Sequence, residues 1–175
     1  MPELTTLSKA DAIAHELELA FRQVENHIQS LSETTYLARP DGRWSPAENL
    51  EHLILSTFPV AGAMGRGPGF FDQFGAPQFP DIEDYAALKA YYASVLQTGV
   101  KAPAKFVPED AKVYQKAEQL AQWEAVGAKL REQCMQWSGQ DLDTKAMMHP
   151  ALGMISVRQM LYFTILHTYH HLEAM

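Results

Sequence analysis

Residues 156–175 read SVRQMLYFTILHTYHHLEAM, and this stretch decides which kind of fold the chain adopts. Ser156 comes shortly after Gly153 and can cap a helix, and RQMLYFTILHTYHHL at 158–172 is apolar on nearly every side for about three turns. A helix that is apolar all round needs neighbours on every side. The sequence therefore predicts a helix from about Ser156 to the last residue, placed centrally in a bundle.

Three further stretches carry apolar side chains at steps of three and four, which is typical of helices: about 8–28, from Ser45 onward, and about 115–137. With the terminal helix they make four. A chain of 175 residues is long enough to bury its own core. We therefore expect one all-α domain over residues 1–175, built as a four-helix bundle.

The second helix, which begins within WSPAENLEHLIL at 44–55, has the clearest start in the chain. Ser45 can cap it, Pro46 suits its first position, and Glu48 completes a capping box. Pro59 is expected to kink or end this helix, because proline removes a backbone donor and crowds the preceding turn. The glycine-rich stretch that follows Pro59 should end it in any case.

The connection between the second and third helices, at about 62–112, is rich in Gly and Pro. A connection of that length without structure of its own is uncommon. Apolar residues at helical spacing in DIEDYAALKAYYASVL, at 81–96, predict a short extra helix there. The aromatic group Phe70, Phe71 and Phe74 either packs on the bundle or covers the mouth of a pocket or an interface. No segment alternates convincingly enough to predict a strand.

Composition excludes several classes of function. The net charge is −7 and no cluster of more than two Lys or Arg occurs, which argues against nucleic acid as a partner. No apolar run approaches the roughly 20 residues that span a bilayer, so we expect no membrane segment. The first 21 residues do not have the pattern of a signal peptide. Cys134 is the only cysteine, which fits a cytoplasmic protein without disulfides.

Three of the seven histidines fall within five positions near the end of the chain: His167, His170 and His171. Residues four apart lie one turn apart on the same face of a helix, so His167 and His171 can reach one metal ion. His170 lies to the other side of His167, and periodicity alone does not exclude it. A third ligand must come from another helix.

His52 is the candidate for that ligand, because it lies on or beside the buried face of the second helix. An unpaired polar group in a core costs about 1–3 kcal/mol, and a shared metal ion removes this cost. Glu48, one turn earlier, is expected to orient the ring of His52. An alternative without metal stays open: a lone core histidine, and terminal histidines that interact with the helix dipole. His15 and His27 are interpreted as structural or surface residues, and His149 as a turn residue.

Two stretches together resemble a known family. GRWSPAENLEHLILS at 42–56 places a Trp and a capped helix start before a histidine, and HPALGMISVRQMLYFTILHTYHHLEAM at 149–175 ends in H-x-x-H-H-L. The pair resembles the DinB/YfiT-like superfamily of metalloenzymes, in particular an uncharacterised branch with a His-Pro turn before the last helix. The resemblance covers nearly the whole chain and is weakest at about 62–112. It implies a four-helix bundle, a divalent metal, usually zinc or nickel, and a homodimer.

Carried over to this chain, the resemblance makes His52, His167 and His171 the metal ligands. His170 matches a neighbouring histidine that is common in the family but is not a ligand. A Gln often found three residues after the last ligand is Ala174 here, which puts any supporting role at that position in doubt.

Three imidazoles leave a divalent ion with an open coordination position, as in catalytic sites. Three functions follow from this arrangement. The first is a thiol S-transferase that uses a low-molecular-weight thiol, because a coordinated thiol deprotonates. The second is a hydrolase that activates water. The third is a non-catalytic, dimeric stress or binding protein, and the sequence does not choose among the three.

Overall fold

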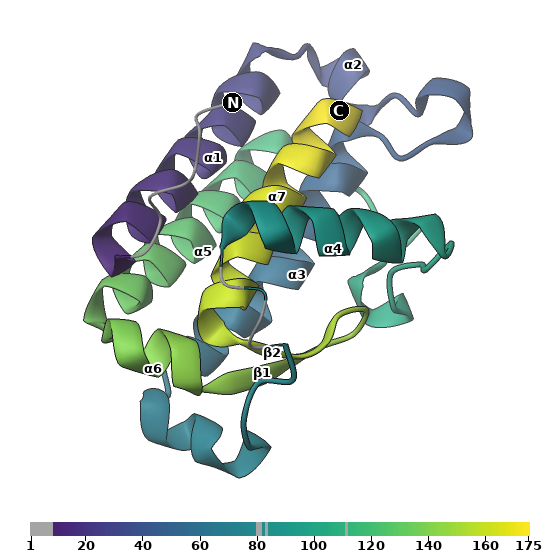
Figure 1. Cartoon of the computed structure of the whole chain (residues 1–175). Helices are drawn as coiled ribbons and strands as arrows, with labels where there is room; N and C mark the ends of the chain where they lie inside the picture. Colours follow the sequence, from purple (N-terminus) through teal and green to yellow (C-terminus); the bar gives the residue numbers. More distant parts are fainter. Residues whose placement is uncertain (1–8, 80–81, 83, 111) are drawn as a thin grey trace.

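The computed structural model describes residues 9–79, 82, 84–110 and 112–175, and these residues are mostly helical. Four long helices supply most of the core: α1 Ala10–Ser30, α3 Pro46–Met64, α5 Lys116–Gln136 and α7 Val157–Ala174. α1 and α3 each pack against both α5 and α7, as Figure 1 shows. The buried faces of the four helices therefore meet in a common apolar core.

The long helices begin and end close to the predicted positions. Ser8, the predicted start of the first helix, lies outside the described residues, and α1 begins at Ala10. The capping box at the start of α3 is confirmed: Ser45 accepts from the backbone N–H of Glu48, and the Glu48 carboxylate accepts from that of Ser45. α3 does not end at Pro59 but continues to Met64, because the residues after Pro59 bury a further apolar turn.

α7 is buried from Val157 to Thr168 without interruption, which confirms the central position predicted for it. A capping box formed by Ser156 and Gln159 begins the helix. Within the described residues, no helix combines the length and apolarity needed to cross a membrane.

The connection between α3 and α5 contains the predicted extra helix. α4, Tyr85–Gln97, begins at Asp84, whose side chain accepts from the N–H of Ala87, and crosses α7 as shown in Figure 1. Asp81 and Glu83, the first acidic residues of the predicted segment, lie outside the described residues. Two short 3-10 helices flank α4: η2 Pro68–Phe74 and η3 Ala104–Phe106. Both contribute to the cavity described below.

The expectation that the chain forms no strand is wrong. β1 Ala146–His149 and β2 Gly153–Ser156 pair as an antiparallel hairpin, with Met147 opposite Ile155. Each strand has four residues, too few for a clear alternation, and Gly153 supplies the positive φ of 76° at the turn. The remaining short elements are α2 Glu33–Leu37, η1 Pro40–Gly42 and α6 Gly139–Thr144.

Candidate metal centre

The three histidines predicted as ligands converge where α3 faces α7. His52 lies in the second turn of α3, and His167 and His171 lie one turn apart near the end of α7. All three side chains are buried, at 5%, 7% and 9% exposure. Each offers a ring nitrogen within 4.8 Å of the other two, and no other such group of metal-binding side chains occurs in the described part of the chain.

The spacing of the ring nitrogens suits a metal ion. The Nε2 atoms of His52 and His167 are 3.0 Å apart, and the ring centroids of the trio are 4.5–4.9 Å apart. Two imidazoles on a tetrahedral zinc ion, with Zn–N of about 2.0–2.1 Å, place their nitrogens roughly 3.3 Å apart. Two unprotonated nitrogens at 3.0 Å repel each other, so a proton or a cation must lie between them.

In His52 and His171, a hydrogen bond at Nδ1 determines that Nε2 is the nitrogen with a free lone pair. The Nδ1 of His52 lies 2.6 Å from the carbonyl oxygen of Phe106 in η3. A carbonyl only accepts, so Nδ1 carries the hydrogen and the Nε2 lone pair points into the cluster. The loop before α5 therefore orients a histidine of α3.

His171 is oriented in the same way by a side chain of α3. Its Nδ1 lies 2.8 Å from Oδ1 of Asn49. The amide nitrogen of Asn49 donates to the carbonyl oxygens of Trp44 and Ser45, at 3.2 and 3.0 Å, which fixes Oδ1 as the acceptor. His171 therefore donates from Nδ1 and presents the Nε2 lone pair, the tautomer that a metal ligand needs.

Burial keeps the three rings neutral. It lowers the pKa of His52, and it lowers the pKa of His171 to about 3 with a further contribution from the neighbouring histidines. Burial, then the positive charge that His171 and His52 carry when protonated, holds the pKa of His167 well below the ordinary range. Neutral imidazole is the form that binds metal, so the cluster is ready for an ion at neutral pH.

The prediction that Glu48 orients His52 is wrong. The Glu48 carboxylate accepts from Arg39 Nε at 2.9 Å and from the backbone N–H of Ser45 at 2.8 Å, so it serves the start of α3. These partners lower its pKa, although burial acts in the opposite direction. The carbonyl of Phe106 occupies the place on the His52 ring that the prediction gave to Glu48.

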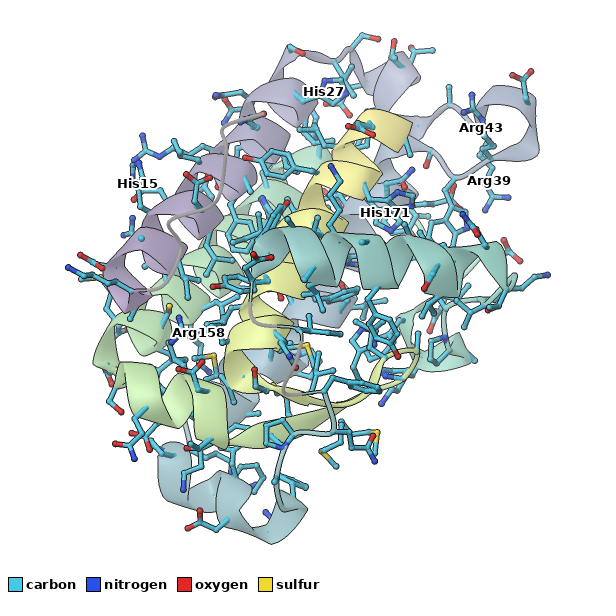
Figure 2. The ribbon with its side chains drawn as sticks, in the orientation of Figure 1. His15, His27, Arg39, Arg43, Arg158 and His171 are labelled. Atoms are coloured by element: carbon cyan, nitrogen blue, oxygen red, sulfur yellow. The ribbon has the colours of Figure 1, made fainter. Side chains whose placement is uncertain are left out.

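The other histidines lie outside the cluster. His170 is exposed, and its ring centroid is 5.2 Å from that of His171. His15 is exposed and His27 half-buried on α1, whereas His171 lies near the end of α7 (Figure 2). The prediction that His149 is a turn residue is wrong for its backbone, because His149 is the last residue of β1 and pairs with Gly153. Its side chain nevertheless holds the turn, since its Nδ1 accepts from the backbone N–H groups of Ala151 and Leu152.

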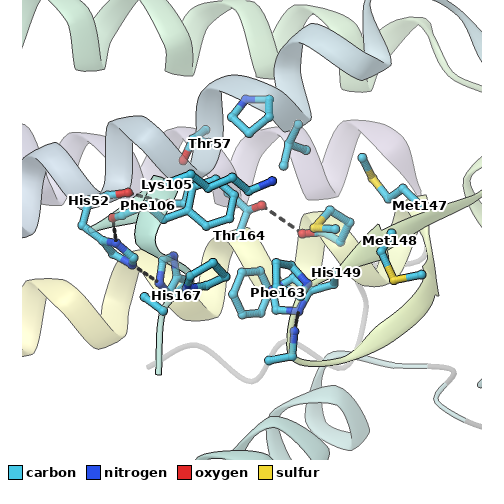
Figure 3. A pocket seen from close by; sticks show the side chains of 18 of the residues that line it. His52, Thr57, Lys105, Phe106, Met147, Met148, His149, Phe163, Thr164 and His167 are labelled. Atoms are coloured by element: carbon cyan, nitrogen blue, oxygen red, sulfur yellow. Dashed lines mark hydrogen bonds between the residues drawn. The ribbon is translucent and has the colours of Figure 1, made fainter. Parts of the chain in front are cut away.

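A cavity of about 510 Å³ opens beside the cluster. Figure 3 shows His52 and His167 at one end and His149 with Met147 and Met148 at the other. Its walls are largely aromatic and aliphatic, and they include Phe70, Phe71, Phe74, Tyr92, Phe106 and Phe163. Phe71 also packs on Trp137, with ring centroids 5.1 Å apart, so this aromatic group both packs on the helices and lines the cavity. The imidazoles thus face an apolar chamber of substrate size.

The family comparison agrees with the fold and with the histidine cluster. The family model described as the DinB superfamily matches residues 16–175, and the chain therefore belongs to the DinB superfamily. No curated protein and no solved structure matches the chain.

Sequence reasoning missed the two groups that orient the ligand rings. Asn49 lies three residues before His52, on the same side of α3, and an amide at that spacing is a signal that a search for ligand partners could have used. The carbonyl of Phe106 carries no such signal, because every residue has a backbone carbonyl and only the path of the loop places this one.

Proposed function

We propose that this protein is a divalent-metal-dependent enzyme in which His52, His167 and His171 hold a zinc or nickel ion. The observation that carries the proposal is the pair of fixed tautomers: Phe106 and Asn49 turn two Nε2 lone pairs toward the same point as His167. A four-helix bundle is part of the proposal, since α1 and α3 each pack against both α5 and α7.

The reaction we propose is the transfer of a low-molecular-weight thiol to an apolar electrophile. When bound, the ion would supply an open position at which a thiol releases its proton to solvent. The sulfur would then bond to the electrophilic carbon while the bond to a leaving group breaks, with that group departing as an anion such as chloride. The described residues that line the cavity include neither Asp nor Glu, so the chamber offers no carboxylate to take a proton from water. This favours a thiol over water as the nucleophile.

The chain's own residues orient and shield the reacting groups. Phe106 and Asn49 hold the His52 and His171 rings, and the indole of Trp44 stacks on the His171 ring with centroids 6.1 Å apart. The apolar walls exclude water from the electrophile, which protects it from hydrolysis. Two further features belong to the proposal: a homodimer, which is carried over from the family, and a cytoplasmic location, which fits the single cysteine, Cys134.

Metal content tests the site. Protein made without a His tag should contain close to one zinc or nickel ion per chain by elemental analysis. His52→Ala and His167→Ala should each bind the ion at least about tenfold more weakly, as expected for losing one of three ligands. His15→Ala, an exposed histidine on α1, is the matched control and should keep the native metal content. Native metal content in both ligand variants contradicts the site.

Turnover tests the reaction. The metal-loaded protein should consume 1-chloro-2,4-dinitrobenzene with at least one of glutathione, bacillithiol or mycothiol, and removal of the metal should abolish the rate. Ester hydrolysis that needs the metal but no thiol, and rises with pH, contradicts S-transfer and supports a hydrolase instead. Tight metal binding without turnover in either assay supports a binding protein.

A further inference from the structure

We propose that the cavity binds an apolar molecule with one anionic group, such as a carboxylate, and that Lys101 and Lys105 hold this group. This inference deepens the proposed function: the bound molecule is the electrophile, and its reacting end faces the three histidines. The anionic group then lies toward the loop between α4 and α5, which carries both lysines.

The charge around the cavity is opposite to that of the chain. The whole protein has 21 acidic residues and a net charge of −7, yet the described residues that line the cavity include Lys101 and Lys105 and no acidic side chain. Neither lysine forms an ion pair with a carboxylate among the described residues, whereas Lys112, Lys116 and Lys145 each do. Two unpaired cations at an apolar chamber attract an anion.

Lys105 extends over the chamber rather than away from it. In Figure 3 its side chain runs past the Phe106 ring and away from His52. The Lys105 ammonium lies 4.8 Å from the centroid of the Phe106 ring. Since the carbonyl of Phe106 also holds His52, one short segment, η3, positions both a cation and a histidine of the cluster. Because the Lys105 side chain runs away from His52, an anion at its ammonium group lies on the side of this residue that points away from the histidine cluster.

The far end of the chamber also offers a donor. His149 accepts two backbone N–H groups at Nδ1, so its ring hydrogen is on Nε2. No acceptor among the described residues faces this Nε2, and the ring lines the cavity against Phe163. The Thr164 hydroxyl, by contrast, already donates to the carbonyl of Met160. Lys101, Lys105 and His149 are thus donors at the cavity for which no acceptor occurs among the described residues, and an anionic ligand supplies that acceptor.

The apolar walls of the cavity determine the chemistry of the remaining part of the ligand. A chamber of about 510 Å³ is within the usual range for small-molecule sites, and rings such as Phe71, Tyr92 and Phe163 line it. A strongly polar thiol in this chamber would leave its own polar groups unpaired. The chamber therefore suits the electrophile, with an aromatic or aliphatic body.

Two fluorescent probes of nearly the same shape test this inference on the metal-free protein. 8-Anilinonaphthalene-1-sulfonate is an apolar anion, and N-phenyl-1-naphthylamine is its neutral counterpart. The native protein should bind the anion more tightly. In Lys101→Met/Lys105→Met the Kd of the anion should rise about tenfold at low salt, while the Kd of the neutral probe stays within about twofold. Lys129→Met, an exposed lysine of α5 away from the cavity, is the matched control and should change neither.

Salt and a second variant sharpen the test. Raising the salt to about 0.5 M should weaken the anion's binding to the native protein but not to the double variant. His149→Phe should weaken the anion by a few fold. Equal affinity of the native protein for both probes, no binding of either, or an unchanged anion Kd in the double variant each overturns the inference. His52→Ala should lose metal but should still bind the anionic probe more tightly than the neutral probe. Failure of the anion-site proposal and failure of the metal-site proposal therefore give different results.

Discussion

Replacing Asn49 by alanine should weaken metal binding although Asn49 is not itself a ligand. The side chain is 3% exposed, and its Oδ1 accepts the Nδ1 hydrogen of His171 at 2.8 Å. In the variant this hydrogen has no acceptor, and nothing then turns the Nε2 of the ring toward His52 and His167. The variant separates the orientation of a ligand from the presence of that ligand.

The expected magnitude follows from the hydrogen bonds that the substitution removes. A buried donor without a partner costs about 1–3 kcal/mol, and loss of a hydrogen bond to a metal-binding histidine typically weakens metal binding about 10–100-fold. We expect the Kd for zinc to rise by this factor. The substitution also removes two hydrogen bonds to the carbonyl oxygens of Trp44 and Ser45, so the metal-free protein should unfold at a lower denaturant concentration.

Chelator competition at fixed pH measures the zinc Kd, and urea unfolding of the metal-free protein measures the stability. Ser56→Ala is the matched control: Ser56 lines the same cavity, but its hydroxyl donates to the carbonyl oxygens of His52 and Leu53 and to neither ring. A zinc Kd for Asn49→Ala equal to that of Ser56→Ala refutes the argument that Asn49 sets the orientation of His171.

Three further predictions concern other parts of the fold. Gly127→Ala should destabilise the protein by about 1–3 kcal/mol in urea unfolding, because the added Cβ would lie 2.5 Å from the Phe21 ring. This effect should outweigh the better helix propensity of alanine. An unchanged unfolding midpoint would contradict the close approach of α1 and α5. Cys134 is buried and its pKa is raised to about 12 by burial, so Ellman's reagent should label it only after unfolding. Burial lowers the pKa of His149 from 6.5 to about 4, so protonation of this ring opposes folding. The contribution of neutral His149 to the free energy of unfolding is therefore complete above about pH 6.5. It is lost at about 1.4 kcal/mol per pH unit as the pH falls toward 4. His149→Phe should remove this part of the pH dependence of urea unfolding in metal-free protein.

The sequence predicted the helices well because their signals are local. The capping box at Ser45 and the cap at Ser156 depend on neighbouring residues, and the burial of α7 follows from a stretch that is apolar on nearly every side. The hairpin was missed because its strands are short. Of the two outcomes predicted at Pro59, a kink or an end, the end does not occur there, because burial of the following turn outweighs the loss at proline; α3 ends at Met64, in the glycine-rich stretch, as predicted.

The sequence predicted which histidines form the cluster, but not which groups orient their rings. A separation of four residues places His167 and His171 on one face, the buried face of the second helix makes His52 the third candidate, and the family resemblance implies the same three residues. The groups that orient the histidine rings could be identified only from the structure. Glu48 was the residue predicted for this role, but its carboxylate accepts from Arg39, nine residues before it. The carboxylate pairs with that cation at the start of α3 instead of with an imidazole.

The loop between α4 and α5 contributes to both the histidine cluster and the cavity. η3 supplies the carbonyl that fixes the tautomer of His52, and the neighbouring Lys101 and Lys105 line the cavity. The three histidines of the cluster lie on α3 and α7, which are fixed by the core, whereas the loop can change without disturbing that core. In this chain, replacing residues 101–106 should alter metal affinity and anion preference together, whereas replacing the two lysines alone should alter only the anion preference.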